Sequence, residues 1–436
     1  LMLYLGTLRA GAVFLPLNPA YTSAELEYFL ADAAPKILVC DSARRDSLAP
    51  VATQACVRSL ETLAADGTGS FSELCAVSAA EFRDVPCGAN DLAAILYTSG
   101  TTGRSKGAML THGNLASNAE ALAVLWRFTP NDVLLHALPI YHTHGLFVAV
   151  NTVLFSGGKI LFMPKFDPGL CLALMPRVTV MMGVPTFYTR LLGDENLSRE
   201  TAAPMRLFIS GSAPLLEETH RAWLARTGHV ILERYGMTET NMITSNPYDG
   251  ARRAGTVGFP LPDVALRIAD PETGNVLAGG QTGVIEVKGP NVFEGYWRNP
   301  EKTAQEFRSD GFFITGDLGR IDADGYVQIV GRAKDLIISG GFNVYPKEVE
   351  SEIDALAGVI ESAVVGLPHE DFGEAVTAFV VRRPNSSLDE PMVRDALAKR
   401  LAKFKVPKRV MFVEELPRNA MGKVQKNVLR ETYKRL

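Results

Sequence analysis

ILYTSGTTGRSKG, residues Ile95 to Gly107, is the stretch around which the rest of the chain is organised. It begins as a short apolar run typical of a buried strand, and it then changes to glycines, small hydroxyl residues and one lysine, Lys106. Glycine lets the backbone approach an anion closely, and hydroxyl and amide N–H groups donate hydrogen bonds to phosphate oxygens. The stretch therefore predicts a loop that holds phosphate, with a lysine at its end to supply positive charge.

Length and composition limit the class of protein. The chain has 436 residues, so we expect two or more domains. It is 47% hydrophobic and 21% charged, with a formal net charge of −4, no long basic stripe and no apolar run long enough to span a membrane. We therefore expect a globular protein without a nucleic-acid or membrane partner.

The cysteines indicate a reducing compartment. The chain has five, widely spaced and without a C-x-x-C pair, which argues against a disulfide framework and against a zinc site. We expect a cytoplasmic location, or a mitochondrial one if a targeting segment precedes the first residue.

The order of apolar and helical patterns predicts an α/β fold. Short apolar runs, each closed by Gly, Ser or Pro, occur at 92–97, 160–163, 178–184 and 206–210. Helical patterns such as 112–126 and 215–227 lie between them. Strands that alternate with helices predict parallel sheets covered on both faces.

The pattern changes twice further along the chain. From about 255 to 331, alternating residues with Gly- and Pro-rich connections predict a smaller, antiparallel β-rich subdomain. We expect a hinge at 332–336 and then a small α+β domain over 337–436. The C-terminal domain's expected elements are a helix from Pro346, strands at 362–366, 375–382 and 409–413, and a helix at 389–403. The prediction is thus a large N-terminal domain (1–331) of stacked αβα sheets with a β-rich subdomain, plus a small α+β C-terminal domain.

The phosphate loop is not a Walker loop. A Walker loop places lysine directly after glycine and a hydroxyl residue directly after lysine, whereas here Lys106 lies between Ser105 and Gly107. YTSGTTGRSKG instead resembles the phosphate loop of the adenylate-forming superfamily, which contains acyl-CoA synthetases, luciferases and adenylation domains of peptide synthetases. An ordinary Gly/Ser/Thr-rich surface turn is the alternative. Further motifs match this superfamily in order, and the resemblance covers nearly the whole chain. Family members usually carry further residues ahead of the first residue of this sequence.

The resemblance implies a nucleotide site. In YGMTET, Tyr235 would stack on adenine, Thr238 would contact phosphate and Glu239 would hold Mg²⁺, a hard cation that prefers carboxylate and phosphate oxygens. Asp317 in TGD would accept the ribose hydroxyls, and Arg332 in GRAKD would contact ribose or phosphate. The residues implied to bind ATP or AMP are Thr98, Ser99, Gly100, Thr101, Thr102, Gly103, Lys106, Gly211, Ser212, Ala213, Tyr235, Thr238, Asp317, Arg332 and Lys423.

The resemblance also assigns roles to the C-terminal motifs. Lys423 in PRNAMGKVQK matches the lysine that enters the active site for adenylation, where a cation offsets the charge growing at the α-phosphate. Lys334 matches the hinge, and Gly340 and Gly341 match the glycines past which the pantetheine arm of CoA reaches the acyl group. The alternative for both lysines is a solvated surface side chain. The implied catalytic residues are Lys423, Thr238, Glu239 and His142.

Two positions bear on the acid substrate. His142 in LPIYHTHGL occupies the acyl-site position of the family; H-x-H also occurs in metal sites, but no third ligand is evident. Arg234 would lie beside the acyl pocket, where a guanidinium is costly unless it meets an anion and is suited to bidentate carboxylate recognition. Its alternative is a structural ion pair with Glu233 or another acidic residue. The candidate substrate-binding residues are His142, Ser212, Arg234, Met237 and Arg253, with Arg253 the second candidate for a distal carboxylate.

Together with VPTFYTRLL and ARRAGTVG, these features resemble the malonyl-CoA synthetases. The implied reaction joins malonate, or methylmalonate, to coenzyme A through an acyl-adenylate, with ATP and CoA as co-substrates, Mg²⁺ as cofactor, and AMP and pyrophosphate as products. Alternatives in the superfamily are a medium-chain or aryl acid:CoA ligase and a domain that loads a carrier protein. A non-catalytic nucleotide-binding protein is the alternative from another class.

Overall fold

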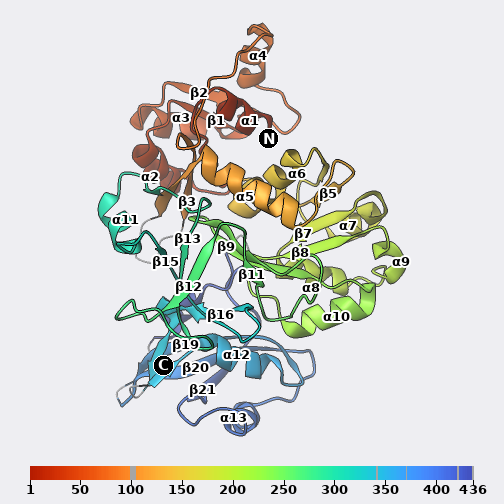
Figure 1. The fold of residues 1–436 in the computed structure, drawn as a ribbon, viewed down its shortest axis with the longest axis vertical. Coiled ribbons are helices and arrows are strands. Elements are labelled where there is room, and N and C mark those ends of the chain that lie inside the picture. Colours follow the sequence, from red (N-terminus) through yellow and green to blue (C-terminus); the bar gives the residue numbers. More distant parts are fainter. Residues whose placement is uncertain (99–104, 340–341, 370, 420–421, 435–436) are drawn as a thin grey trace.

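The computed structural model describes residues 1–98, 105–339, 342–369, 371–419 and 422–434. Figure 1 shows a mixed α/β fold with a large N-terminal part and a small C-terminal part. The described α-helices are α1 Met2–Arg9, α2 Ser23–Ala33, α3 Arg45–Gln54, α4 Ser70–Val77, α5 His112–Leu125, α6 Asn151–Phe155, α7 Pro168–Leu174, α8 Pro185–Leu192, α9 Arg199–Ala202, α10 Glu217–Thr227, α11 Pro300–Glu306, α12 Pro346–Asp354, α13 Glu390–Ala398 and α14 Lys426–Tyr433. Three 3-10 helices (η1 Ser42–Arg44, η3 Met175–Arg177, η4 Ala333–Asp335) and a π-helix (η2 His144–Val150) complete the helical segments.

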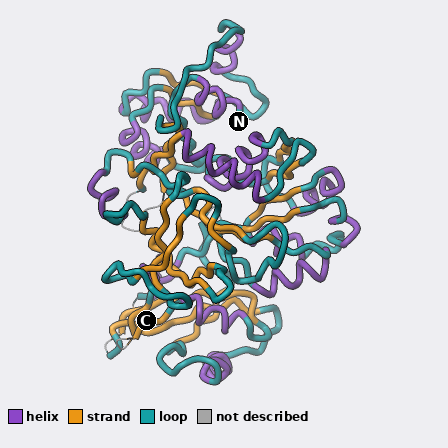
Figure 2. The backbone as a smooth tube through the Cα atoms, viewed as in Figure 1, coloured by secondary structure: helices purple, strands orange, loops and turns teal. Residues whose placement is uncertain are grey.

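The described strands form five sheets. They are β1 Ile37–Cys40, β2 Ser59–Thr62, β3 Leu92–Thr98, β4 Lys106–Thr111, β5 Val133–His136, β6 Lys159–Phe162, β7 Val180–Gly183, β8 Leu207–Ser210, β9 Leu232–Met237, β10 Asn241–Ser245, β11 Phe259–Pro260, β12 Ala265–Ala269, β13 Gly283–Lys288, β14 Gly295–Tyr296, β15 Phe313–Ile321, β16 Val327–Arg332, β17 Ile337–Ser339, β18 Phe342–Val344, β19 Val359–His369, β20 Gly373–Arg382 and β21 Arg409–Val413. In Figure 2 these strands gather through the middle and the C-terminal part, with most helices outside them. No described helix is long and apolar enough to cross a membrane.

The strand that opens the phosphate loop belongs to an antiparallel sheet. β3 pairs antiparallel with β4, and the last residue of β3, Thr98, lies opposite the first residue of β4, Lys106. β14 adds to the other side of β4. The prediction of a parallel sheet was therefore wrong for 92–97: the chain returns directly as a hairpin, which only an antiparallel pair allows over so short a connection.

The parallel prediction was correct for the larger sheet. β6, β5, β7, β8 and β9 run parallel in that spatial order, and β10 and β11 add antiparallel strands at the β9 edge. Successive side chains of a strand point to opposite faces. Accordingly, Val180 and Met182 of β7 belong to the core shared with the β3–β4 sheet, whereas Met181 packs in a second core with residues of α7, α8 and α10.

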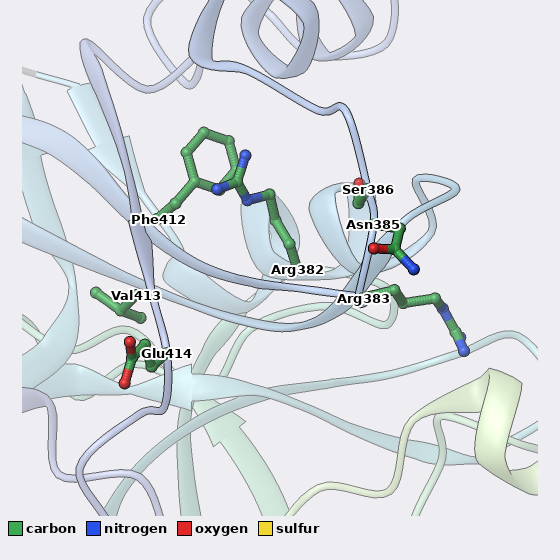
Figure 3. Close-up of a pocket in the computed structure, with 7 residues that line it drawn as sticks. All are labelled: Arg382, Arg383, Asn385, Ser386, Phe412, Val413 and Glu414. Atoms are coloured by element: carbon green, nitrogen blue, oxygen red, sulfur yellow. The ribbon is translucent and has the colours of Figure 1, made fainter.

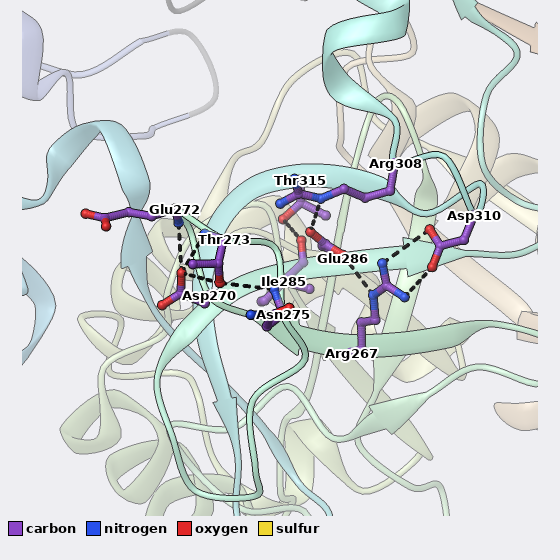
Figure 4. Close-up of polar contacts among 10 residues, drawn as sticks. All are labelled: Arg267, Asp270, Glu272, Thr273, Asn275, Ile285, Glu286, Arg308, Asp310 and Thr315. Atoms are coloured by element: carbon purple, nitrogen blue, oxygen red, sulfur yellow. Dashed lines mark hydrogen bonds and ion pairs between the residues drawn. The ribbon is translucent and has the colours of Figure 1, made fainter.

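The β-rich subdomain is antiparallel, as predicted, with strand order β12-β13-β15-β16. Its centre is Glu286 of β13, which is 0% exposed and pairs with Arg267 at 2.8 Å and Arg308 at 2.6 Å (Figure 4). Nearby, the Thr315 hydroxyl donates to the Ile285 carbonyl at 2.8 Å. Two arginines thus compensate one buried carboxylate beside β15, the strand that carries Asp317.

The small C-terminal part is an α+β unit, as predicted, with its own cores on the two faces of the β17–β21 sheet. The strands at 362–366 and 375–382 are longer than predicted (β19 and β20), and the helix at 389–403 is shorter (α13). α14 was not predicted, and η4 lies where the hinge was predicted. The domain boundary itself stays a prediction.

The two parts contact each other at several places. Gly422 lies against α8, since a Cβ added to it would be 3.4 Å from the Thr186 hydroxyl. A surface pocket of about 310 Å³ follows the ends of β20 and β21 (Figure 3). In this view Arg383 extends away from Phe412, and its guanidinium pairs with Glu218 of α10 at 2.8 Å. The small C-terminal part therefore contacts α8 and α10 of the large part.

Candidate active site

Arg234 is buried on β9, and one edge of its guanidinium has no partner among the described residues. It is 3% exposed, and the atoms on that edge, Nε and Nη2, form no hydrogen bond within the part of the chain that the structure describes. Burial lowers its pKa to about 9, an effect that the nearby Tyr188 opposes. Nε and Nη2 lie on the same edge of the planar group, the edge that binds a carboxylate through two parallel hydrogen bonds.

Gly211 gives Arg234 its space. A Cβ added to Gly211 would lie 2.4 Å from the Cζ atom of Arg234, so a side chain there would displace the guanidinium. Gly211 follows β8, and Ser212 comes next in a left-handed backbone conformation (φ 70°). The Ser212 hydroxyl lies 3.0 Å from Nδ1 of His144. The segment that begins with Gly211 and Ser212 therefore forms one wall around the arginine, together with η2.

Glu233 does not neutralise Arg234. The two are consecutive on β9, whose alternation directs them to opposite faces of the sheet. Burial raises the pKa of Glu233 to about 8, a hydrogen bond from the Gly255 amide lowers it, and Glu217 raises it further. The predicted alternative, an ion pair within this dipeptide, is absent from the ion pairs of the described residues. Arg253 has other partners: it is 41% exposed and pairs with Asp324 at 2.8 Å and Asp322 at 3.5 Å.

His142 lies close to both Arg234 and Lys423. Burial, followed by the positive charges of Arg234 and Lys423, lowers the pKa of His142 to about 4, so its imidazole is neutral. The amide of His144 contacts Nδ1 of His142 at 3.4 Å. Burial and Arg234 also lower the pKa of His144. The described residues contain no group of three or more His, Cys, Asp or Glu side chains that could hold a metal, so the H-x-H segment has no further ligands there.

Tyr235, Asp317 and Arg332 form a connected unit at the junction of β9, β15 and β16. The Tyr235 hydroxyl donates to Asp317 at 2.5 Å, and Arg332 pairs with the other Asp317 oxygen at 2.7 Å. Asp317 and Arg332 are direct neighbours in the antiparallel register of β15 and β16. Tyr235 and Arg332 are nearly a hundred positions apart in the sequence, yet both contact Asp317, the residue that the resemblance implies to bind the ribose.

Lys423 extends toward this unit. Water reaches its side chain, but the surrounding protein removes part of the solvation of the ammonium group. This desolvation, followed by the charge of Arg332, lowers the pKa of Lys423 to about 8, and Asp317 opposes the shift. Lys334, on η4, is exposed, and partial desolvation lowers its pKa.

Glu239 lies at the end of the phosphate loop. It is buried, which raises its pKa, and the hydroxyl of Tyr296 contacts its Oε1 at 3.1 Å. The same hydroxyl contacts Glu306 at 2.5 Å, and Glu306 pairs with Lys106 at 3.2 Å. Sequence reasoning missed Tyr296 and Glu306, because only the pairing of β14 with β4 brings them to the loop.

The other predicted residues have these positions. Thr238 and Met237 lie half-buried at the turn from β9 to β10, and Ala213 follows Ser212. Thr98 ends β3. Outside the described residues lie Ser99, Gly100, Thr101, Thr102, Gly103, Gly340 and Gly341.

The sequence and the fold match those of known enzymes. Family profiles match at residues 1–297 (AMP-binding enzyme) and 348–423 (AMP-binding enzyme C-terminal domain). A malonate–CoA ligase of Arabidopsis thaliana is 38% identical over 98% of this chain and 75% of its own length. ATP-bound MatB from Rhodopseudomonas palustris is 65% identical, covers 99% of this chain and 86% of its own, and has a TM-score of 0.98. Apo MatB has the same identity and coverage but a TM-score of 0.85. On the profile match over more than half of its length, together with these relatives, the chain belongs to the AMP-binding enzyme family, the adenylate-forming enzymes.

Proposed function

We propose that this protein is an AMP-forming acid–thiol ligase that joins malonate, or methylmalonate, to coenzyme A. The observation that carries the choice of acid is the unpartnered edge of Arg234, buried beside Gly211 and His142. A monocarboxylate would leave this guanidinium unpaired, which is costly in a buried site. The distal carboxylate of malonate supplies the missing partner through two hydrogen bonds, while the proximal carboxylate stays free to react.

In the first half-reaction, an oxygen of the proximal carboxylate attacks the α-phosphorus of ATP and pyrophosphate leaves. Tyr235 stacks on adenine, and Asp317 and Arg332 hold the ribose. Lys423 extends toward the same region, which supports its role of offsetting negative charge at the α-phosphate. A preorganised cation of this kind acts without reorganisation at the moment of reaction.

Mg²⁺ fits the proposed site. Glu239 offers one buried carboxylate next to the phosphate loop, and Mg²⁺ is commonly held by one or two carboxylates together with substrate phosphates. When bound, it would neutralise charge on the triphosphate. Glu239 would ligate it, Thr238 and the loop residues 98–103 would contact the phosphates, and Lys106 would add a second cation.

In the second half-reaction, the thiol of CoA attacks the acyl carbon of malonyl-adenylate and AMP leaves. The C-terminal domain turns about Lys334, withdraws Lys423 and opens the route beside Gly340 and Gly341. No side-chain nucleophile is required, because the mixed anhydride is already activated. The greater similarity to ATP-bound than to apo MatB supports a domain arrangement that precedes this turn. We also propose that the protein acts in the cytoplasm.

A panel of mono- and dicarboxylic acids tests the proposal, with pyrophosphate release and acyl-CoA formation measured in parallel. We expect AMP-forming turnover with malonate, weaker or equal turnover with methylmalonate, and little with butyrate or an aryl acid. Equal or faster turnover with monocarboxylates would contradict the choice of acid. Absence of acid-dependent pyrophosphate release with every acid would contradict the enzymatic function itself.

A further inference from the structure

Glu306, the last residue of α11, turns its side chain inward toward the phosphate loop. Its side chain is 20% exposed and has three polar contacts: Lys302 at 2.9 Å, Lys106 at 3.2 Å and the Tyr296 hydroxyl at 2.5 Å. Lys302 is its i−4 neighbour on the helix, but Lys106 lies 200 positions away in the sequence. A solvated residue at a helix end would pair with Lys302 alone, so the contacts with Lys106 and Tyr296 indicate a defined position for this carboxylate.

The Lys106 amine has a defined position because of two contacts. Glu306 pairs with it, and the amine also lies 4.3 Å from the centre of the Tyr296 ring, within the range of a cation–π interaction. The Lys106 side chain is 13% exposed, and it lines a pocket of about 290 Å³ together with Ser105 and Gly107. An ammonium group has three donors, so the pair with Glu306 leaves donors for a phosphate on the open side.

Tyr296 and α11 are fixed to the strand that follows the loop. Tyr296 pairs with Ala108 of β4, and its own amide donates to the Thr303 hydroxyl of α11 at 2.9 Å. Helix α11 begins with a side-chain cap from Asn299. The carboxylate of Glu306 therefore has a rigid connection to the backbone of the phosphate-loop hairpin.

We propose that Glu306 is a positioning residue of the nucleotide site: it holds the Lys106 amine against Tyr296, in the orientation that receives the triphosphate of ATP. This inference rests on the proposed function only in that Lys106 contacts ATP. A carboxylate near a triphosphate also repels it. Removing Glu306 would therefore strengthen ATP binding by relieving repulsion and weaken it by releasing Lys106, and the measured change in affinity shows which effect is larger. Lys302 and Lys106 both pair with Glu306, and Glu239 adds a second carboxylate beside Tyr296, so the two lysines and two carboxylates balance. Because Glu306 is compensated by its own lysine partners, we expect the ordering of Lys106 to decide the sign.

The expected size follows from the freedom that Lys106 gains when Glu306 is removed. Immobilising a long side chain on binding costs about 0.5–1.5 kcal/mol, which corresponds to about a two- to twelvefold weaker interaction with ATP. Glu306→Gln should therefore raise the KM for ATP about two- to twelvefold. The kcat and the KM for malonate should stay within about twofold of the wild-type values. Lys302→Met is the matched control, since it removes the other cation from Glu306 and leaves Lys106 paired; its KM for ATP should stay unchanged.

A double-mutant cycle tests the route of the effect. In a Lys106→Met background, Glu306→Gln should cause no further rise in the KM for ATP, and Glu306→Asp should recover part of the loss in the presence of Lys106. Equilibrium binding of MgATP without any acid gives a second measurement, with thermal unfolding to show that each variant is folded. Unchanged or tighter ATP binding by Glu306→Gln, or an equal loss with and without Lys106, would overturn the inference. Because the binding measurement needs no acid, it stands even if malonate proves not to be the substrate.

Discussion

Replacing Arg234 by methionine separates a role in binding the acid from a role in the fold. Methionine fills much of the same volume against Gly211 but has no charge and no N–H donors. If malonate's distal carboxylate pairs with Arg234, the variant leaves that carboxylate buried and unpartnered. Breaking a buried charged pair from one side costs about 3–5 kcal/mol. This predicts a kcat/KM for malonate roughly 150- to 5,000-fold lower.

The same change should not harm a monocarboxylic acid. In the wild-type protein, butyrate would place a methyl group against an unpaired guanidinium; in Arg234→Met it meets an apolar side chain instead. We expect kcat/KM for butyrate to stay equal or to rise. Arg234→Lys keeps the charge but loses the planar fork, so its activity on malonate should lie between those of the wild type and Arg234→Met.

Stability should change in the opposite direction from activity. Since Nε and Nη2 of Arg234 have no hydrogen-bond partner among the described residues, methionine removes a buried charge that they leave uncompensated. The free energy of unfolding should stay equal or rise by up to roughly 3 kcal/mol, measured by denaturant titration without ligand. Equal losses on malonate and butyrate, together with lower stability, would refute the reasoning and make Arg234 structural. A malonate-selective loss in Arg253→Met would transfer the role to Arg253.

Three further predictions concern other parts of the molecule. Lys423→Ala should abolish formation of malonyl-adenylate but retain formation of malonyl-CoA from supplied malonyl-adenylate, measured as separate half-reactions; loss of both would contradict a role confined to the first. Burial raises the pKa of Glu233 to about 8, so the folded state binds a proton that the unfolded state releases near pH 4.5; stability should therefore fall as pH rises between these values, and Glu233→Gln should flatten this part of the unfolding profile. Glu286→Ala should lower the free energy of unfolding by about 3–5 kcal/mol in chemical denaturation, because Arg267 and Arg308 lose their shared buried partner; a loss under 1 kcal/mol would indicate that water replaces the carboxylate.

The sequence patterns predicted most of the fold because each element has a local cause. At α2, for example, Thr22 and Glu25 have capping-box spacing, and both hydrogen bonds of the box are present. Period-two alternation predicted the antiparallel β-rich subdomain. The predicted direction of β3 relative to its neighbour was wrong, because a buried apolar run does not indicate which strand it pairs with. Pairing depends on the length of the connection, and here the phosphate loop itself returns the chain as a hairpin.

The candidate site was predictable where a motif carries it and not where packing assembles it. Tyr235, Asp317 and Arg332 lie in recognisable motifs and do meet in space. Arg253 lies in an equally suggestive segment, yet Asp322 and Asp324 pair with it, which no local spacing indicates. Glu306 shows the converse, since its sequence neighbourhood reveals only the helix pair with Lys302.

The close contact of Gly211 with Arg234 has a consequence for changing the substrate range. An added Cβ at residue 211 would lie 2.4 Å from the guanidinium carbon, so a larger residue there would push the arginine out of its present position. The two positions are therefore coupled, and the order of substitution matters. A route to bulkier or uncharged acids is open if Arg234 is replaced first, whereas a change at Gly211 first would pass through a protein that binds neither kind of acid well.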